Sequence, residues 1–173
     1  MNCPDCGHDN IEGVDICEQC GQSLATVSIS RSQIELSISS HPIELLTKKK
    51  PLSVDQATPI RKVVKTMSES KTGCVLVMEN NLLVGIFTER DLLNKVSVNS
   101  ENLNCPVGEF MTPTPETVRN QDSIGFALHT MDSGGYRHLP VVGTSEKPEA
   151  IISVRDILRY LCIRFAKIRS EPV

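Results

Sequence analysis

Four of the seven cysteines lie within the first twenty residues, in two Cys-x-x-Cys-Gly motifs separated by ten residues. Cys3 and Cys6 form the first pair, and Cys17 and Cys20 form the second. A turn of this kind aims backbone N–H groups at a thiolate, and its glycine permits the tight backbone angle. Two facing turns present four sulfurs at tetrahedral positions, which suits Zn²⁺ and leaves no open coordination position. The motifs therefore predict a structural zinc site rather than a catalytic one.

A hydroxyl and a carboxylate occur three residues apart at two places, as Thr88 and Asp91 and again as Ser153 and Asp156. At a strand-to-helix junction both groups lie beside the helix N-terminus, where backbone N–H groups converge. A carboxylate can accept hydrogen bonds from both hydroxyls of a cis-diol such as ribose. The alternative is that both acids are first-turn helix residues capped by Thr88 and Ser153. The occurrence of the set twice favours a binding site.

The elements that position these residues are themselves repeated, because the chain from 51 to 91 recurs almost without gaps from 115 to 156. Such a repeat indicates two copies of one unit, each with a face that the other covers. The pattern of residues in each copy predicts a strand, a helix, two strands and a second helix. In the first copy, the first helix is expected to begin at Thr58-Pro59. We therefore expect an α+β fold in which two β-α-β-β-α repeats pack as a pseudo-symmetric pair. The expected strands are 52–54, 74–78, 82–87, 137–142 and 150–152, and the expected later helices are 88–96, 123–134 and 156–168.

The chain divides into four segments: a metal-binding knuckle at 1–24, a linker at 25–41, and repeats at 42–100 and 101–169. Apolar residues alternate at Ile34, Leu36 and Ile38, which fits one strand as well as a linker. Charge is balanced at 18 basic and 21 acidic residues, so composition indicates attraction to neither nucleic acid nor membrane. No signal peptide and no apolar run of about 18 residues is found. We expect a cytoplasmic protein.

Several spaced motifs of the repeat resemble a known family. They are Gly85-Ile-Phe-Thr-Glu-Arg-Asp91, Met111-Thr-Pro-Thr-Pro-Glu-Thr-Val118, Arg137-His-Leu-Pro-Val-Val142 and Ile152-Ser-Val-Arg-Asp156. The repeat resembles a tandem cystathionine-β-synthase (CBS) domain pair, often called a Bateman module, and residues 1–24 resemble a zinc ribbon. The resemblance implies that AMP, ADP or ATP, and sometimes S-adenosylmethionine, binds between the copies, and that the pairs form a homodimer.

The resemblance also assigns site residues. Asp91 and Asp156 take ribose, with Thr88 and Ser153 nearby, and phosphates meet basic residues of the opposite copy. The complete set is Thr47, Thr88, Arg90, Asp91, Thr112, Arg137, His138, Ser153, Arg155 and Asp156.

The two clefts are not equivalent. The resemblance implies that Arg137, His138 and Arg155 face Asp91. It implies that uncharged Gly73 and Cys74 face Asp156, which leaves that cleft Arg90 and the lysine run 48–50. Because charge-assisted bonds carry phosphate recognition, we expect the nucleotide at Asp91, and at Asp156 either nothing or a less charged ligand. One extra residue after Thr47, relative to Thr112, leaves open whether Thr47 reaches its cleft or is displaced.

The combined features predict a non-catalytic regulatory module, since no nucleophile–base set, phosphate-binding loop or open metal site is found. The knuckle region contains acids and no Lys or Arg, which argues against nucleic acid and for docking to a protein partner. Two alternatives remain: a dimerisation scaffold with empty clefts, and a nucleic-acid-binding ribbon tethered to a sensor.

Overall fold

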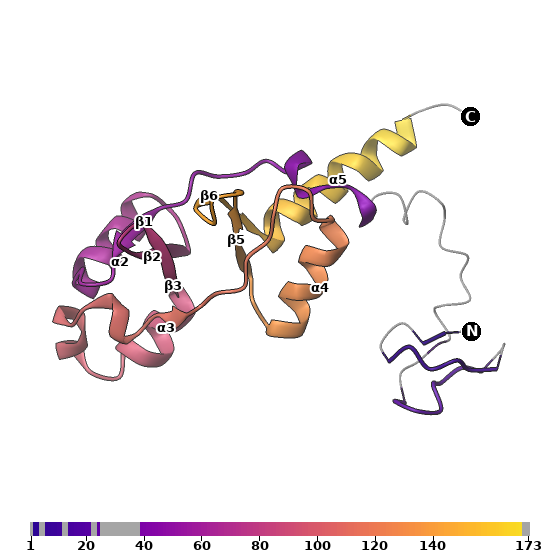
Figure 1. Ribbon diagram of the computed structural model, residues 1–173, viewed down its shortest axis with the longest axis horizontal. Coiled ribbons are helices and arrows are strands. Elements are labelled where there is room, and N and C mark those ends of the chain that lie inside the picture. Colours follow the sequence, from indigo (N-terminus) through magenta and orange to yellow (C-terminus); the bar gives the residue numbers. More distant parts are fainter. Residues whose placement is uncertain (1, 4–5, 12–13, 22–23, 25–38, 171–173) are drawn as a thin grey trace. The chain divides into compact units, whose positions relative to one another are not determined.

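The computed structural model describes residues 2–3, 6–11, 14–21, 24 and 39–170, and the chain divides into two compact units, 1–38 and 39–173 (Figure 1). The strand predicted around Ile34, Leu36 and Ile38 lies outside the described residues. Ser39 and Ser40, at the end of the predicted linker, are helical. The second unit holds both repeats and is described first.

The first repeat has the predicted order of elements. They are β1 (Ser53–Asp55), α2 (Ile60–Glu69), β2 (Cys74–Glu79), β3 (Leu82–Thr88), α3 (Glu89–Asp91) and the π-helical turn η2 (Leu92–Val96). β1 runs parallel to β2, and β2 pairs antiparallel with β3. Asn80 and Asn81 close this hairpin with φ of 49° and 64°, a conformation that asparagine tolerates well.

The start of α2 differs from the expectation. The helix begins at Ile60 rather than at Pro59, and the preceding residues supply no side-chain cap. The Ile60 N–H instead donates to the carbonyl of Cys105, 3.0 Å away. A segment distant in the sequence thus accepts from this first N–H of the helix, where a capping side chain was expected.

The second repeat repeats this pattern with a shorter sheet. Its elements are the 3₁₀ turn η4 (Val107–Glu109), β4 (Thr112–Pro113), α4 (Ile124–Gly134), β5 (His138–Val142), β6 (Pro148–Ser153) and α5 (Val154–Ser170). Ser123 caps α4, since its hydroxyl accepts from the Phe126 N–H at 3.0 Å. Gly135 ends α4 with φ of 65°, as the Gly134-Gly135 pair predicts. In Figure 1, α4 and α5 lie beside β5 and β6.

Each repeat has its own aliphatic core. In the first repeat, the buried face of α2, formed by Ile60, Val63 and Met67, packs against the inward side chains of β2 and β3. In the second, Ile124, Ala127 and Met131 of α4 do the same against β5 and β6. Each fully buried large side chain contributes about 1.5–3 kcal/mol. The apolar residues at helical spacing in the sequence are thus the residues that α2 and α4 bury in the two cores.

The first segment of each repeat packs on the other repeat. β4, at the start of the second repeat, pairs with β3 of the first, and Val107 is fully buried in the first core. Reciprocally, Lys49 pairs with Ile151 of β6. Ile43, in the 3₁₀ turn η1 (Ile43–Leu45), is fully buried in the second core. The two repeats are joined by exchange of these segments as well as by contact.

A small apolar cluster lies between the repeats. Cys74, Leu76 and Ile86 of the first repeat pack with Ile151 of the second. Cys74 is 2% exposed, and burial raises the pKa of its thiol to about 11. This cluster fixes the relative position of the two strand-to-helix junctions, at 88–91 and 153–156, that carry the predicted carboxylates.

Candidate nucleotide and metal sites

One cavity of about 200 Å³ lies beside Asp91, between the two repeats. Its walls come from the junction of β3 and α3, from β4, and from the residues that join α4 to β5. The lining residues are Gly73, Ile86, Thr88, Glu89, Arg90, Asp91, Thr112, Gly135, Tyr136, Arg137 and His138. The cavity thus combines a carboxylate from one repeat with basic side chains from the other.

The Asp91 carboxylate is held from two sides and is only 8% exposed. Its Oδ2 accepts from the Thr88 hydroxyl at 2.7 Å and from the Thr88 N–H at 3.0 Å. The second of these bonds and the bond from the Asp91 N–H to the Thr88 hydroxyl, at 3.3 Å, form a capping box. Asp91 Oδ1 accepts from the Thr112 hydroxyl at 3.2 Å, across the exchanged strand β4. The orientation of Asp91 therefore depends on both the local turn and the neighbouring segment.

Lys95 completes the surroundings of Asp91. Its Nζ lies 2.7 Å from Asp91 Oδ1, one helical turn along the chain. Burial alone would raise the pKa of Asp91, but hydrogen bonds from Lys95 and Thr88, with the Lys95 charge, lower it below its ordinary value. The carboxylate is consequently ionised at neutral pH, the form in which both of its oxygens accept hydrogen bonds.

The opposite wall is basic. Arg137 and His138 line the cavity from the second repeat, and the Arg90 guanidinium donates to the Gly135 carbonyl at 3.0 Å. Burial lowers the pKa of His138, and the Arg137 and Lys49 charges lower it further, against the opposing effect of Asp156 and Glu89. An anionic group entering here would stabilise the protonated imidazole.

The second cleft has a similar carboxylate but different neighbours. The Ser153 hydroxyl donates to Asp156 Oδ2 at 2.6 Å, and the Ser153 N–H donates to the same atom at 2.9 Å. Lys49 takes the register position that Thr112 has in the first cleft, because its pairing with Ile151 matches the pairing of Thr112 with Ile86. Its Nζ lies 3.9 Å from Asp156 Oδ1.

The structure brings six of the ten predicted nucleotide residues to one cavity: Thr88, Arg90, Asp91, Thr112, Arg137 and His138. Arg90 and Gly73 were expected to face Asp156, but both line the cavity beside Asp91. Ser153 and Asp156 form the second hydroxyl–carboxylate pair. Arg155 and Thr47 are exposed and line neither wall of the cavity. Thr47 is displaced by the longer segment that follows it, and Lys49 from the lysine run takes the corresponding position.

Two charged residues were missing from the sequence prediction: Lys95, which binds Asp91 but is not one of the residues that line the cavity, and Glu89, which is. Lys95 has a readable signal, because a lysine four residues after an acid on a helix pairs with it. Glu89 adds a second carboxylate to the lining. Glu89 and His138 both lie close to Gly73: a Cβ at Gly73 would be 3.4 Å from Glu89 Oε2 and 3.6 Å from His138 Cε1. The proximity of Glu89 to Gly73 and His138 depends on the packing of the two repeats, which no local pattern shows.

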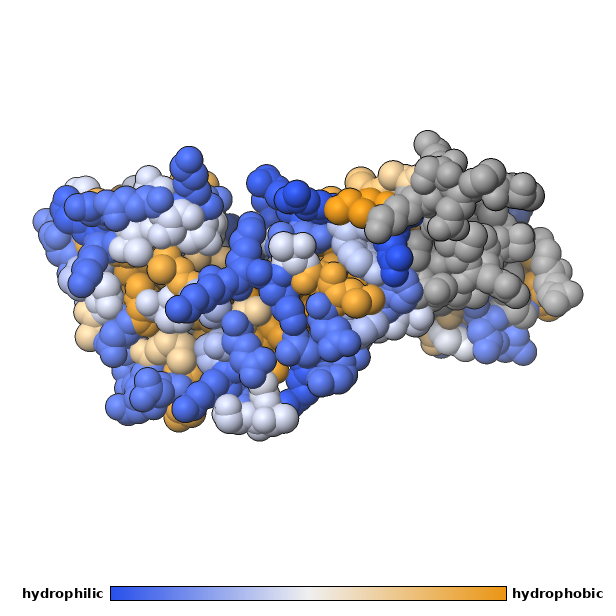
Figure 2. Space-filling model, turned by 90° about the horizontal axis from the view of Figure 1, so that it is seen from above, coloured by the Kyte–Doolittle hydropathy of each residue, from blue (hydrophilic) through white to orange (hydrophobic). Residues whose placement is uncertain are grey.

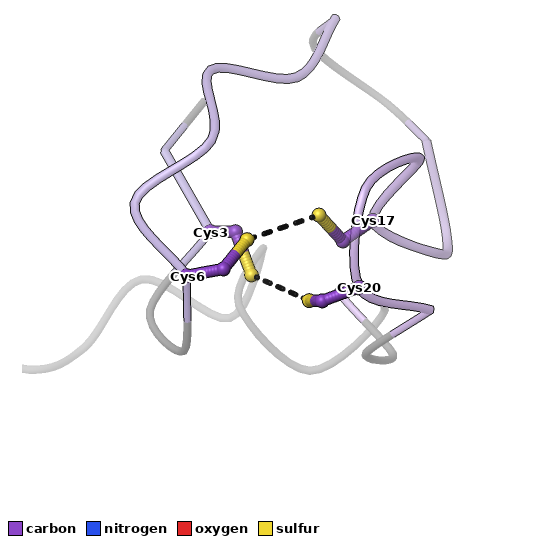
Figure 3. A group of neighbouring side chains, drawn as sticks. All are labelled: Cys3, Cys6, Cys17 and Cys20. Carbon is purple, nitrogen blue, oxygen red and sulfur yellow. Dashed lines mark hydrogen bonds between the residues drawn. The ribbon is translucent and has the colours of Figure 1, made fainter.

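The four clustered cysteines of the first unit lie together (Figure 3). Their sulfurs are all within 4.8 Å of one another, with Cys3 to Cys20 at 3.6 Å and Cys6 to Cys17 at 3.7 Å. A tetrahedral site with Zn–S bonds of about 2.3 Å requires sulfur separations of about 3.8 Å. The donor set and its geometry therefore fit a zinc ion.

Backbone geometry shapes both knuckles in the same way. The Gly7 and Gly21 N–H groups donate to the carbonyls of Cys3 and Cys17, each at 2.9 Å. Both glycines have positive φ, 73° and 74°, which a residue with a side chain adopts only with strain. This explains why glycine follows each Cys-x-x-Cys pair.

Asn10 connects the two knuckles and is only 4% exposed. Its Nδ2 donates to the His8 carbonyl at 2.9 Å, and its Oδ1 accepts from the Glu18 N–H at 3.1 Å. Although burial raises the pKa of Cys17, hydrogen bonds from the Cys20 and Gln19 backbone and from Asn10 lower it to about 6. At neutral pH this sulfur is a thiolate, the form that binds metal.

Comparison with known proteins agrees with this architecture. Residues 43–98 and 107–163 match the model of the CBS domain. An uncharacterised 17.7 kDa protein of Acidianus ambivalens is 34% identical over 103 residues, which are 59% of this chain and 62% of that protein. Arabinose 5-phosphate isomerase of Francisella tularensis is 31% identical over 100 residues, 58% of this chain and 31% of the enzyme. The chain thus spans less than two thirds of either relative.

Among solved structures, CBSX2 in complex with AMP is 25% identical to this chain, with a TM-score of 0.61. The match covers 71% of this chain and 97% of that one. In the part of the chain that the structure describes, no helix is both long and apolar enough to span a bilayer.

Proposed function

The chain belongs to the CBS domain family, and from this premise we propose that it is a regulatory, non-catalytic module that binds an adenine nucleotide (AMP, ADP or ATP) beside Asp91. One observation carries the proposal: a single cavity of about 200 Å³ has an ionised carboxylate on one wall and Arg137 and His138 on the other. Ribose and phosphate are the two polar parts of a nucleotide, and they need these two kinds of partner.

The arrangement supports a specific orientation. The ribose hydroxyls would meet Asp91 and Thr112, whose oxygens lie 3.2 Å apart. The phosphate would extend towards Arg137, His138 and the Arg90 side chain, and Ile86 offers an apolar surface for the purine. The AMP complex of CBSX2 supports an adenine nucleotide as the ligand class.

The Asp156 cleft is proposed to take no phosphate. Cys74, which pairs with Thr88 on β3, has the place that His138 has opposite Ser153 on β6. Its thiol is neutral, because burial raises its pKa to about 11. Lys49, whose Nζ lies 3.9 Å from Asp156 Oδ1, pairs with Ile151 of β6, the strand that leads to Asp156.

The four cysteines are proposed to hold one structural Zn²⁺. Four thiolates complete the coordination, so the metal would stabilise the fold of a small unit and supply no open position for chemistry. The described part of this unit exposes Ile11 and Ile16, at 73% and 59%, next to the acidic Asp15 and Glu18. These apolar and acidic groups support docking to a basic protein partner.

Association of two chains is also proposed. Phe126 of α4 and Leu158 of α5 are 50% and 53% exposed, and Phe165 of α5 is 44% exposed. Figure 2 shows apolar patches on one face of the molecule, separated by polar side chains. Burying such side chains against a second copy would remove apolar area from water.

A thermal-shift panel with AMP, ADP, ATP, S-adenosylmethionine and GTP tests the nucleotide proposal. A ligand at about 100 times its Kd should stabilise the protein by about 2.7 kcal/mol, which is several degrees for a domain of this size. Asp91→Ala should abolish the shift. Asp156→Ala is the matched control, since it removes an equivalent capping box and should keep the shift.

Absence of a shift with every nucleotide would contradict the proposed function, as would an equal loss in both variants. For the metal, elemental analysis of protein purified without added metal should find one zinc per chain. Iron, or no metal, would overturn the zinc assignment.

A further inference from the structure

Lys95 contacts two parts of the molecule at once. Its Nζ lies 2.7 Å from Asp91 Oδ1, and it also donates to the Phe110 carbonyl at 3.1 Å and lies 3.5 Å from the Met111 carbonyl. Phe110 and Met111 belong to the segment that leads from η4 into β4. Lys95 therefore links the carboxylate of the cavity to the segment between the repeats.

The hydrogen-bonding capacity of Asp91 is fully used in this arrangement. A carboxylate offers about four acceptor positions. Oδ2 accepts from the Thr88 hydroxyl and N–H, and Oδ1 accepts from Thr112 and Lys95. A ribose diol brings two further donors, so at least one existing donor must leave before the diol can bind.

The two donors on Oδ1, Thr112 and Lys95, are the ones that can give way. On Oδ2 the Thr88 N–H is held in the capping box at the start of α3, which the bond from the Asp91 N–H to the Thr88 hydroxyl completes. The Thr112 hydroxyl can rotate and accept from a ribose hydroxyl, so it can stay beside the ligand. The Lys95 ammonium has donors only and occupies Oδ1 at the shorter distance.

The backbone around Lys95 is unusual. Residues Leu92–Val96 form a π-helical turn, closed by a bond from the Ser97 N–H to the Leu92 carbonyl at 2.9 Å. Single π turns are rare and are frequent at functional sites. The second repeat differs at this point: four residues after Asp156 lies Tyr160, whose hydroxyl bonds to His41 and Arg164.

We propose that Lys95 occupies the ribose position on Asp91 in the ligand-free protein and is displaced when nucleotide binds, which releases its bonds to the Phe110–Met111 segment. The inference rests on the proposed nucleotide function. Lys95 would then connect Asp91 to the Phe110–Met111 segment in the ligand-free protein and would no longer do so once nucleotide is bound. The second repeat has Tyr160 at the position of this lysine, and Asp156 contacts its exchanged segment through Lys49 instead.

The first test is the affinity of Lys95→Met for adenosine and for AMP, measured by titration calorimetry. Adenosine carries the same diol without a phosphate, so it reports the competition at Asp91 alone. Removing the competitor should tighten adenosine binding roughly tenfold, the scale of a hydrogen bond to a charged group, and the ligand-free variant should melt at a lower temperature. Lys65→Met is the matched control, because Lys65 pairs with Glu69 at the same i,i+4 spacing, 3.9 Å apart, on the surface.

A second test uses the unaltered protein, so it does not depend on the folding of a variant. Modification of lysine amines by an acylating reagent, read by mass spectrometry, should label Lys95 faster when AMP is present. Unchanged or slower labelling would overturn the displacement, as would unchanged or weaker adenosine binding by Lys95→Met. If the unaltered protein binds neither adenosine nor AMP, the proposed function fails and this inference fails with it. If binding depends on Asp91 but neither test responds as expected, this inference alone fails.

Discussion

Two polar side chains are buried among the described residues, and each holds a site in place. Asp91 and Asn10 are 8% and 4% exposed. A buried polar group is costly unless its hydrogen bonds are made, and both make several bonds that join separate turns of the chain. At the scale of single residues, both candidate sites therefore depend on a buried polar group: Asp91 would itself touch the ligand, whereas Asn10 supports the cysteines without being one of them.

Asn10→Ala should weaken metal binding although Asn10 is not a ligand. The change removes the bonds to His8 and Glu18, so the two knuckles lose the bridge that keeps their sulfurs close. Loss of such a supporting contact typically reduces metal affinity about 10- to 100-fold. Titration with Co²⁺, followed by its thiolate charge-transfer absorption and by displacement with Zn²⁺, measures the change.

Gln19→Ala is the matched control for this prediction. The Gln19 side chain is exposed, and the contact of this residue with Cys17 comes from its backbone N–H, which the substitution keeps. Equal metal affinity in Asn10→Ala and the unaltered protein would show that the knuckles hold their geometry without the bridge.

Among the secondary-structure elements, two short 3₁₀ turns, η1 and η4, each contribute a fully buried side chain to a hydrophobic core. η1 has three residues, yet Ile43 is fully buried in the second core and its N–H bonds to the Asp122 carbonyl at 2.9 Å. η4 places Val107 in the first core in the same way. A 3₁₀ turn of this length has no stability of its own, so these segments are held by their burial.

Ile43→Ala should destabilise the protein by about 2–5 kcal/mol, because truncation of a buried isoleucine removes apolar contacts and leaves a cavity. Leu45→Ala in the same turn is the control, since Leu45 is 48% exposed and should change the stability little. Urea denaturation of both variants measures the difference. Similar small effects would mean that η1 contributes little to the second core.

The sequence predicts the long elements well and the exchange between repeats poorly. α2 and α4 show their buried faces as apolar residues at helical spacing. The end of α4 at the Gly134-Gly135 pair is also readable, whereas the sequence leaves its cap open between Asp122 and Ser123. The partners of Val107 and Ile43 are not readable, because a 3₁₀ turn of three residues has no period and its contacts are distant in the chain. Long-range pairing also decides the register that brings Lys49 rather than Thr47 to the second cleft.

For the molecule as a whole, the exchange means that one repeat cut at its sequence boundary is incomplete. A fragment of residues 50–104 contains β1 to η3 but lacks Val107 and β4. A fragment of residues 50–114 includes both. We expect the longer fragment to show the more cooperative thermal transition, because it closes the core and covers the edge of β3. Circular dichroism melting compares the two, and equal melting curves would contradict the role assigned to the exchanged segment.

The exchanged segments also set an order for folding during synthesis. A chain emerging from the ribosome usually folds unit by unit from its N-terminus. Here Ile43 and Leu46 are made early, but the core that buries them is not complete until Ile157 has been added. The first repeat needs Val107 and β4, so it closes only when the start of the second repeat is already being translated. Ile43 and Leu46 therefore stay without their core partners while more than a hundred further residues are synthesised. During this period both side chains are accessible to a chaperone that binds nascent chains.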